Sequence, residues 1–508
     1  MTLIQQVYGP FFLRTLAALV ALDVLSFLTL HSVWETILFG AFTLALVVIA
    51  IRKPEWLLPL ALAEVISTSN GHSLNVELFG VSIGLRMVVF AVLLVATAWK
   101  CAKNRTTYLT SSRFLVLFLF ASVVILALVQ GIVAGHSIRD VYLDTNGYLA
   151  FLYIWAAIVW VQTSKDRHRL FQAFGAGVTW LTSKTLLFVL LFAHMQGKAL
   201  VPINTWIRDT RLGELTFQFD HVYRVFLQSQ WFVVVALLLV VAYLVFERHR
   251  DSHARLMVIP MFSVLLISLS RSFWVGALAG GIVLLGWFVL KGRMRPFFNR
   301  LFTFVTLGVA SVAWLYVLVA LPIQGLQRAS LGTLFSQRAT KTSDIAIDSR
   351  KQLLPPLLSA FGEAPIQGHG LGKNVRYRTQ DPKYIESHNT DLVSTYAFEW
   401  GWIDVLVKFG VVGTAMLLLV LILCVRELWK AAIIDTDRSW IYAAGMASVA
   451  ALSVTHFFSP YLNHPIGWMT VAFLFAFIPA QCQATVKVEH TAQIPMPKRT
   501  LEGAVPRT

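Results

Sequence analysis

Several long stretches of this chain contain no charged residue. Residues 225–246, 272–290 and 301–327 have no Asp, Glu, Lys or Arg. Each is close to or longer than the ~20 residues that a helix needs to cross a bilayer. Only 13% of all residues are charged, against about 25% in soluble domains. The sequence therefore predicts an all-α polytopic integral membrane protein, and excludes a large water-soluble enzyme, a coiled coil, a disordered chain and a disulfide scaffold.

The apolar segments predict about 12–14 transmembrane helices. The predicted spans are residues 11–30, 34–51, 54–67, 78–99, 113–134, 146–163, 170–193, 225–246, 255–270, 272–290, 302–322, 405–425, 439–457 and 464–483. The last two share an uncharged block, 439–486, in which residues 459–465 supply a turn because they contain two prolines and an Asn.

Lys and Arg concentrate in alternate connections between the spans. One set is rich in them and includes residues 100–113, 165–169, 291–300 and 426–438, whereas short connections of the other set contain only Arg139. By the positive-inside rule, the basic set and both termini are cytoplasmic. The same rule explains the formal net charge of +16, so we expect no nucleic-acid partner.

Two long connections, residues 194–224 and 323–404, then lie outside. We expect the second to form a folded, partly helical cap. The predicted organisation is N-terminal membrane helices at 1–193, central membrane helices with a short external loop at 194–322, a large periplasmic loop at 323–404, C-terminal membrane helices at 405–486 and a cytoplasmic tail at 487–508.

The external side carries most of the polar motifs. They are Tyr223-Arg224, Ser268-Leu269-Ser270-Arg271, Arg350 with Leu354, Gly368-His369-Gly370-Leu371-Gly372, and His388-Asn389 with Leu392. Two further charges, Arg86 and Lys184, lie inside predicted spans, where a charge costs ~2.5–3.5 kcal/mol. Asp23 and Glu64 are available as partners. We predict an ion pair for Lys184 and a place in an external phosphate cavity for Arg86.

These motifs, in this order and on one side of the membrane, resemble the O-antigen ligase and O-antigen polymerase superfamily over about residues 200–425. The resemblance implies a GT-C-like fold in the bacterial inner membrane. It also implies inverting transfer of a glycan from undecaprenyl diphosphate to an acceptor hydroxyl on the periplasmic face, without metal or other cofactor. The implied partners are this donor, a glycan or lipid A-core acceptor, and membrane lipids. His388 corresponds to the catalytic histidine, and Arg224 and Arg271 to the arginines that hold the diphosphate.

The side-chain chemistry fits these roles. Arginine presents a planar set of donors that matches phosphate bidentately, and histidine can remove a proton from an acceptor hydroxyl near neutral pH. We rank Arg350 as a second phosphate contact and His369 as a structural residue or a substrate contact. Asn389, Glu386 or Asp391 is the group that orients the catalytic ring. The alternatives are a hydrogen-bonded loop histidine at 388 and arginines that only extend to the membrane surface.

The acceptor stays open among a repeat unit, lipid A core and a protein hydroxyl. The ligase pattern has Gly eleven residues after the histidine, where this chain has Glu399, and this departure favours a polymerase. The rival function is a transporter or flippase that binds a lipid-linked glycan with the same arginines. It would need structural repeats or matched half-helices, which the sequence does not show.

Overall fold

The computed structural model describes residues 3–78, 81–104, 112–195, 197–219, 222–246, 251–320, 345–380 and 382–478. Over these ranges the protein is an all-α polytopic membrane protein, in which ten helices are long and apolar enough to cross a membrane. The predicted tail at 487–508 and the start of the predicted periplasmic loop, residues 323–344, lie outside the described residues.

Twelve of the predicted spans contain a single long or medium apolar helix. These helices are α2 (Pro10–Thr29), α3 (Val33–Arg52), α5 (Leu85–Asn104), α6 (Ser112–Val133), α9 (Ser164–His194), α11 (Trp231–Phe246), α12 (Ser252–Ile267), α13 (Arg271–Leu290), α14 (Met294–Ala320), α18 (Gly401–Ile434), α19 (Ser439–Phe458) and α20 (Pro465–Phe477). The long stretches without charged residues were therefore sufficient to locate most of the helices.

Four predicted spans contain no helix of membrane-crossing length among the described residues. Two of them hold the shorter apolar helices α12 and α20, and the other two depart further from the prediction. The span at 54–67 is the 12-residue helix α4 (Leu57–Thr68), and the span at 146–163 is divided between α7 (Ile138–Leu149) and α8 (Leu152–Trp160). At 1.5 Å per residue, none of these helices reaches across the roughly 30 Å of a hydrocarbon core. All residues of α4 except Leu60 are buried, so neighbouring helices rather than lipid surround it. Burial inside the protein removes the need for a full-length helix.

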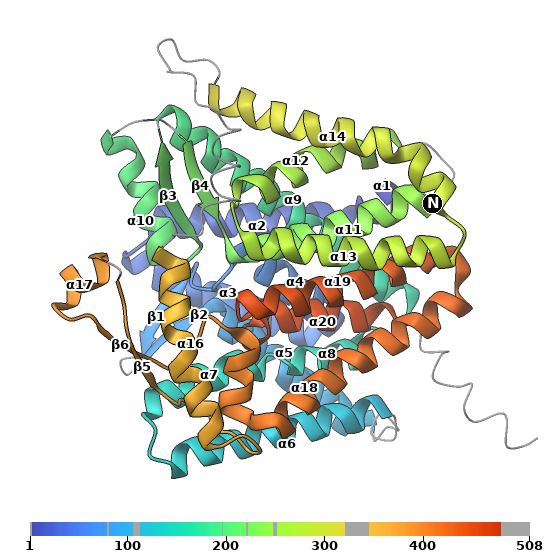
Figure 1. The fold of residues 1–508 in the computed structure, drawn as a ribbon. Helices are drawn as coiled ribbons and strands as arrows, with labels where there is room; N and C mark the ends of the chain where they lie inside the picture. Colours follow the sequence, from blue (N-terminus) through green and yellow to red (C-terminus); the bar gives the residue numbers. More distant parts are fainter. Residues whose placement is uncertain are drawn as a thin grey trace, which may run out of the picture.

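Three two-stranded antiparallel hairpins lie at one end of the bundle (Figure 1). They pair β1 (Asn75–Leu78) with β2 (Val81–Gly84), β3 (Glu214–Phe219) with β4 (Val222–Phe226), and β5 (Val375–Arg378) with β6 (Leu392–Thr395). The first hairpin replaces the start of the predicted span 78–99, and β4 replaces the start of 225–246. Helices α10 (Val201–Asp209), α16 (Ile345–Glu363) and α17 (Pro382–His388) lie at this end too, whereas helix α1 (Leu3–Val7) lies near the opposite end (Figure 1).

Helix α13 packs closely along α19 because glycines face the partner helix. A Cβ added at Gly276 would collide with the Thr455 side chain, and one at Gly280 would lie 3.0 Å from the Ala447 carbonyl oxygen. Small residues allow membrane helices to approach in this way. This packing fixes the first turn of α13, which begins at Arg271, against the hairpin end of α19.

Candidate functional site

Arg224 on β4 contacts the turn between α12 and α13. Its Nε donates a hydrogen bond of 2.9 Å to the Ser268 carbonyl oxygen, and its guanidinium carbon lies 4.6 Å from the Phe226 ring centroid. A carboxylate oxygen of Glu214 is 3.8 Å from Nη1. The side chain keeps 17% of its surface exposed, so its position is defined while part of it remains accessible.

The Ser-x-Ser-Arg motif forms the turn that places Arg271 at the first position of α13. Leu269 has a φ of +47°, a left-handed conformation that is costly for a residue with a Cβ. The Ser270 and Ser272 hydroxyls lie 3.1 Å apart, and Ser459 donates to Ser272 at 3.1 Å. The serines therefore hold the turn together, and the structure brings Arg224 and Arg271 to the same turn.

Tyr461 lies behind this turn and connects it to the next loop. Its hydroxyl donates to the Gln228 carbonyl oxygen at 3.1 Å, and its ring centroid is 5.6 Å from that of Phe273. Burial raises the pKa of the Tyr461 phenol well above its usual value, and the positive charge of Arg224 opposes this shift. Tyr461 is therefore a neutral hydrogen-bond donor beside the arginine.

Arg86, at the start of α5, is buried in an ion pair. Nε lies 3.1 Å from a Glu64 carboxylate oxygen, Nη1 donates to the Ser69 carbonyl oxygen at 2.5 Å, and Nη2 donates to the Thr68 hydroxyl at 2.8 Å. Only 7% of the residue is exposed. Glu64 is thus the partner that the buried charge requires, and a direct phosphate contact by Arg86 remains only a prediction.

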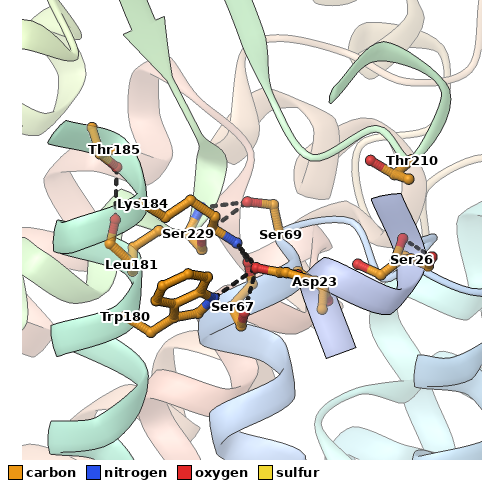
Figure 2. Close-up of polar contacts among 12 residues, drawn as sticks. Asp23, Ser26, Ser67, Ser69, Trp180, Leu181, Lys184, Thr185, Thr210 and Ser229 are labelled. Carbon is orange, nitrogen blue, oxygen red and sulfur yellow. Dashed lines mark hydrogen bonds and ion pairs between the residues drawn. The ribbon is translucent and has the colours of Figure 1, made fainter. Parts of the chain in front are cut away.

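The predicted ion pair of Lys184 is confirmed, with Asp23 as its partner. Nζ lies 2.7 Å from Asp23 Oδ2 and 2.7 Å from the Ser67 carbonyl oxygen, and Trp180 Nε1 donates to the same Asp23 oxygen at 2.7 Å. Figure 2 shows both donors converging on this carboxylate. Ser69, two residues after Ser67, contacts Ser229 at 2.9 Å between the hydroxyl oxygens. The segment 67–69 therefore joins the two buried ion pairs to the loop after β4.

Arg211 and His72 lie close to the Arg86 ion pair, and neither of them was identified from the sequence. Asn70 donates to the Arg211 carbonyl oxygen at 3.0 Å and lies 3.0 Å from His464 Nε2. Burial, followed by the positive charges of Arg211 and Arg86, lowers the pKa of His72 to about 4. His72 is therefore neutral at pH 7 in a positive environment. Arg211 has a φ of +51°, and nothing in its local sequence marks it as part of this group.

His388 and Asn389 lie at the edge of the molecule, on and just after α17 (Figure 1). The His388 ring stacks on Tyr384 with centroids 4.2 Å apart, and Nδ1 lies 2.8 Å from the Ser387 hydroxyl oxygen. Asn389 ends the helix with a φ of +50° and its backbone N–H donates to the Ile385 carbonyl oxygen at 2.8 Å. In the described part of the chain these contacts are local, so the structure does not bring His388 or Asn389 to the arginines.

Arg350 and His369 have partners within the large loop. Arg350, on α16, forms an ion pair with Glu399, in which the arginine side chain is 31% exposed. His369 Nε2 lies 2.6 Å from the Ala360 carbonyl oxygen, and the His369 backbone N–H donates to the Val407 carbonyl oxygen at 2.8 Å. These contacts join α16 and the glycine-rich segment to α18.

The glycine-rich segment inserts between α6, α7 and α18. Gly368, Gly370 and Gly372 all have φ between +73° and +80°, which only glycine adopts readily. The Gly370 N–H donates to the Lys408 carbonyl oxygen at 3.0 Å, and a Cβ at Gly370 would collide with Gly131. The glycines are therefore required by turn geometry and close packing.

A buried ionic cluster, Asp144–Lys408–Asp404, lies directly beneath this segment. Lys408 Nζ is 2.7 Å from Asp144 and 2.7 Å from Asp404, and all three side chains are at most 6% exposed. The Gly372 N–H donates to Asp144 at 2.9 Å, and the Tyr148 hydroxyl donates to Asp404 at 2.9 Å. Sequence reasoning assigned no role to this cluster, because its two aspartates are 260 residues apart and only Asp404 and Lys408 have helical spacing.

In the residues that the structure describes, no group of three or more His, Cys, Asp or Glu side chains is placed to hold a metal ion. Whether the reaction depends on metal stays a prediction.

Residues 256–418 match the protein family described as O-antigen ligase. The match runs from α12 into α18 and includes Arg271, Arg350, His369 and His388, whereas Arg86 and Arg224 lie before it. No curated protein matches the chain. The family match confirms the resemblance to the O-antigen ligase superfamily and supports a role in glycan processing at a membrane.

Proposed function

We propose that this membrane protein transfers a glycan from undecaprenyl diphosphate to an acceptor hydroxyl at the hairpin end of the bundle. One observation carries the proposal. Arg224, from β4, is bonded to Ser268 in the turn that ends at Arg271. Two arginines from separate parts of the chain thus meet at one turn, on the side that the loop charges predict to be periplasmic.

This arrangement suits a diphosphate leaving group. Arginine stays protonated and can bind two phosphate oxygens at once, and the N-terminus of α13 adds the positive end of the helix dipole. The acceptor oxygen attacks the anomeric carbon while the bond from that carbon to the diphosphate breaks. The negative charge that develops on the diphosphate is then stabilised by the two guanidinium groups and the N-terminus of α13.

The proton of the acceptor hydroxyl goes to His388 in this mechanism. The His388 ring is exposed on α17 and its described contacts are local. Because proton transfer requires hydrogen-bond distance, α17 and the start of α13 must come closer in the reacting complex. A proton-accepting residue contributes about 10²–10⁴-fold to the rate.

We further propose that the acceptor is a glycan repeat unit, which would make the protein a polymerase. The ligase pattern has glycine where this chain has Glu399, and Glu399 forms an ion pair with Arg350 on α16. A glycine at position 399 would leave an uncharged surface beside the large loop, whereas Glu399 and Arg350 place a charged pair there. The ion pair also gives Arg350 a local partner, so we rank it below Arg224 as a phosphate contact.

The test uses purified protein in lipid nanodiscs with an undecaprenyl-diphosphate-linked repeat unit as donor. A transferase converts it to longer carrier-linked chains, which mass spectrometry resolves, whereas a transporter leaves every covalent bond unchanged. Arg224→Ala should abolish elongation, whereas Arg208→Ala should not, since Arg208 is 74% exposed at the same end. Equal activity of the two variants would contradict the assigned site.

The acceptor is decided by adding lipid A core to the same reaction. Transfer to the core in preference to a second repeat unit would show a ligase and overturn the polymerase assignment. Surface glycans of a deletion strain give the corresponding result in cells, because loss of a polymerase leaves single-repeat lipopolysaccharide.

A further inference from the structure

A cavity of about 420 Å³ lies between α11, α12 and α14, at the end of the bundle away from the three hairpins. Its polar lining is Arg255, Asn299, Arg300 and Thr303, and its apolar lining includes Leu244 and Phe304. Among the described residues that line it, none is acidic. The cavity therefore combines two positive charges with neutral polar groups and an apolar wall.

The helix geometry brings these side chains together. Asn299, Arg300, Thr303 and Phe304 have the spacing of one face of α14, since residues three and four apart are neighbours on a helix. Arg255 reaches the cavity from the first turn of α12, which Asp251 caps by accepting the Ala254 N–H at 3.1 Å. The second Asp251 oxygen accepts the Tyr243 hydroxyl at 3.3 Å. The Asp251 carboxylate is thus engaged by the helix cap and by Tyr243.

We propose that this cavity binds the phosphate group of an anionic membrane lipid. Two guanidinium groups match a phosphate diester, Asn299 and Thr303 can bond the oxygens of a glycerol head group, and Leu244 and Phe304 can pack against the first acyl carbons. The loop charges predict that this end is cytoplasmic, where anionic lipids attract basic residues and basic pockets between membrane helices bind their head groups. The site is distinct from the proposed transfer site, which lies at the opposite end.

Lipid binding is measured by native mass spectrometry of the full chain, released from nanodiscs that contain dioleoylphosphatidylglycerol and dioleoylphosphatidylcholine in equal amounts. Wild-type protein should retain phosphatidylglycerol preferentially. Each arginine near such a lipid contributes roughly five-fold to binding, so Arg255→Gln with Arg300→Gln should weaken retention by roughly 25-fold. The control is Arg295→Gln, because Arg295 is exposed in the first turn of α14 and does not line the cavity.

Two further measurements separate the possible outcomes. Inorganic phosphate is titrated against bound phosphatidylglycerol, and displacement of the lipid by millimolar phosphate would show a free-anion site and overturn the lipid assignment. A photoactivatable phosphatidylglycerol should label peptides that contain residues 299–304. This measurement uses the wild-type protein, so it does not depend on whether a variant folds. Labelling spread over the helices without enrichment there, or equal retention by the double variant and Arg295→Gln, would refute the proposal.

Discussion

The buried cluster Asp144–Lys408–Asp404 makes the most quantitative prediction, through the substitution Lys408→Met. Lys408 Nζ lies 2.7 Å from each carboxylate, and its side chain is 1% exposed. Methionine retains most of the volume but removes the only cation that the structure places between these two aspartates among the residues it describes. Loss of one partner of a buried pair costs about 3–5 kcal/mol, because the remaining charge is uncompensated. We expect a loss of this size in the free energy of unfolding.

The matched control is Arg378→Met on β5. Arg378 also contacts a carboxylate, Asp391, at 3.6 Å, but the two side chains are 82% and 48% exposed. An exposed pair contributes about 0–1 kcal/mol, so this variant should unfold close to the wild-type midpoint. Both variants are unfolded by denaturant in mild detergent, with tryptophan fluorescence as the signal.

A third variant tests the electrostatic reason for the loss. Adding Asp144→Asn and Asp404→Asn to Lys408→Met removes both uncompensated charges and should recover part of the stability. Lys408→Met should also expose the loop to protease, because Gly370 bonds the Lys408 backbone and Gly372 bonds Asp144. A loss in Lys408→Met within 1 kcal/mol of that in Arg378→Met would refute the reasoning.

Three other predictions follow from the site. His388→Ala should abolish transfer but leave binding of the lipid-linked donor nearly intact. Arg271→Ala should weaken donor binding as well, and Arg271→Lys should restore this binding only partly. Binding and turnover are measured separately, and near-normal turnover in His388→Ala would remove the catalytic assignment. Turnover should persist in excess EDTA if the arginines alone neutralise the diphosphate. Loss of turnover in EDTA, followed by its recovery when magnesium is added, would contradict this. The pKa of His72 is about 4 in the fold, below its usual ~6.5, so the unfolded chain binds more protons between these values and stability should fall as the pH drops from about 6.5 toward 4. His72→Gln should reduce that fall in pH-dependent unfolding, and an unchanged pH profile would contradict the shift.

The sequence by itself determined the class of protein and the location of most helices. These properties depend on each segment alone, because insertion in a bilayer follows the summed hydrophobicity of about 20 consecutive residues. The ion pair of Lys184 could be anticipated for a related reason. A charge within a span is too costly to remain unpaired, and few acidic residues were available to pair with it.

Only the tertiary structure decided which distant residues meet. Helices α4 and α8 are apolar enough to be taken for spans, but burial among other helices allows them to be short. Arg224 reaches the turn at Ser268 because a hairpin replaces the expected start of a helix. Asp144 reaches Lys408 because the glycine-rich segment packs between α6, α7 and α18. Such contacts depend on how loops and helix ends pack over long sequence separations, and neither composition nor periodicity records that packing.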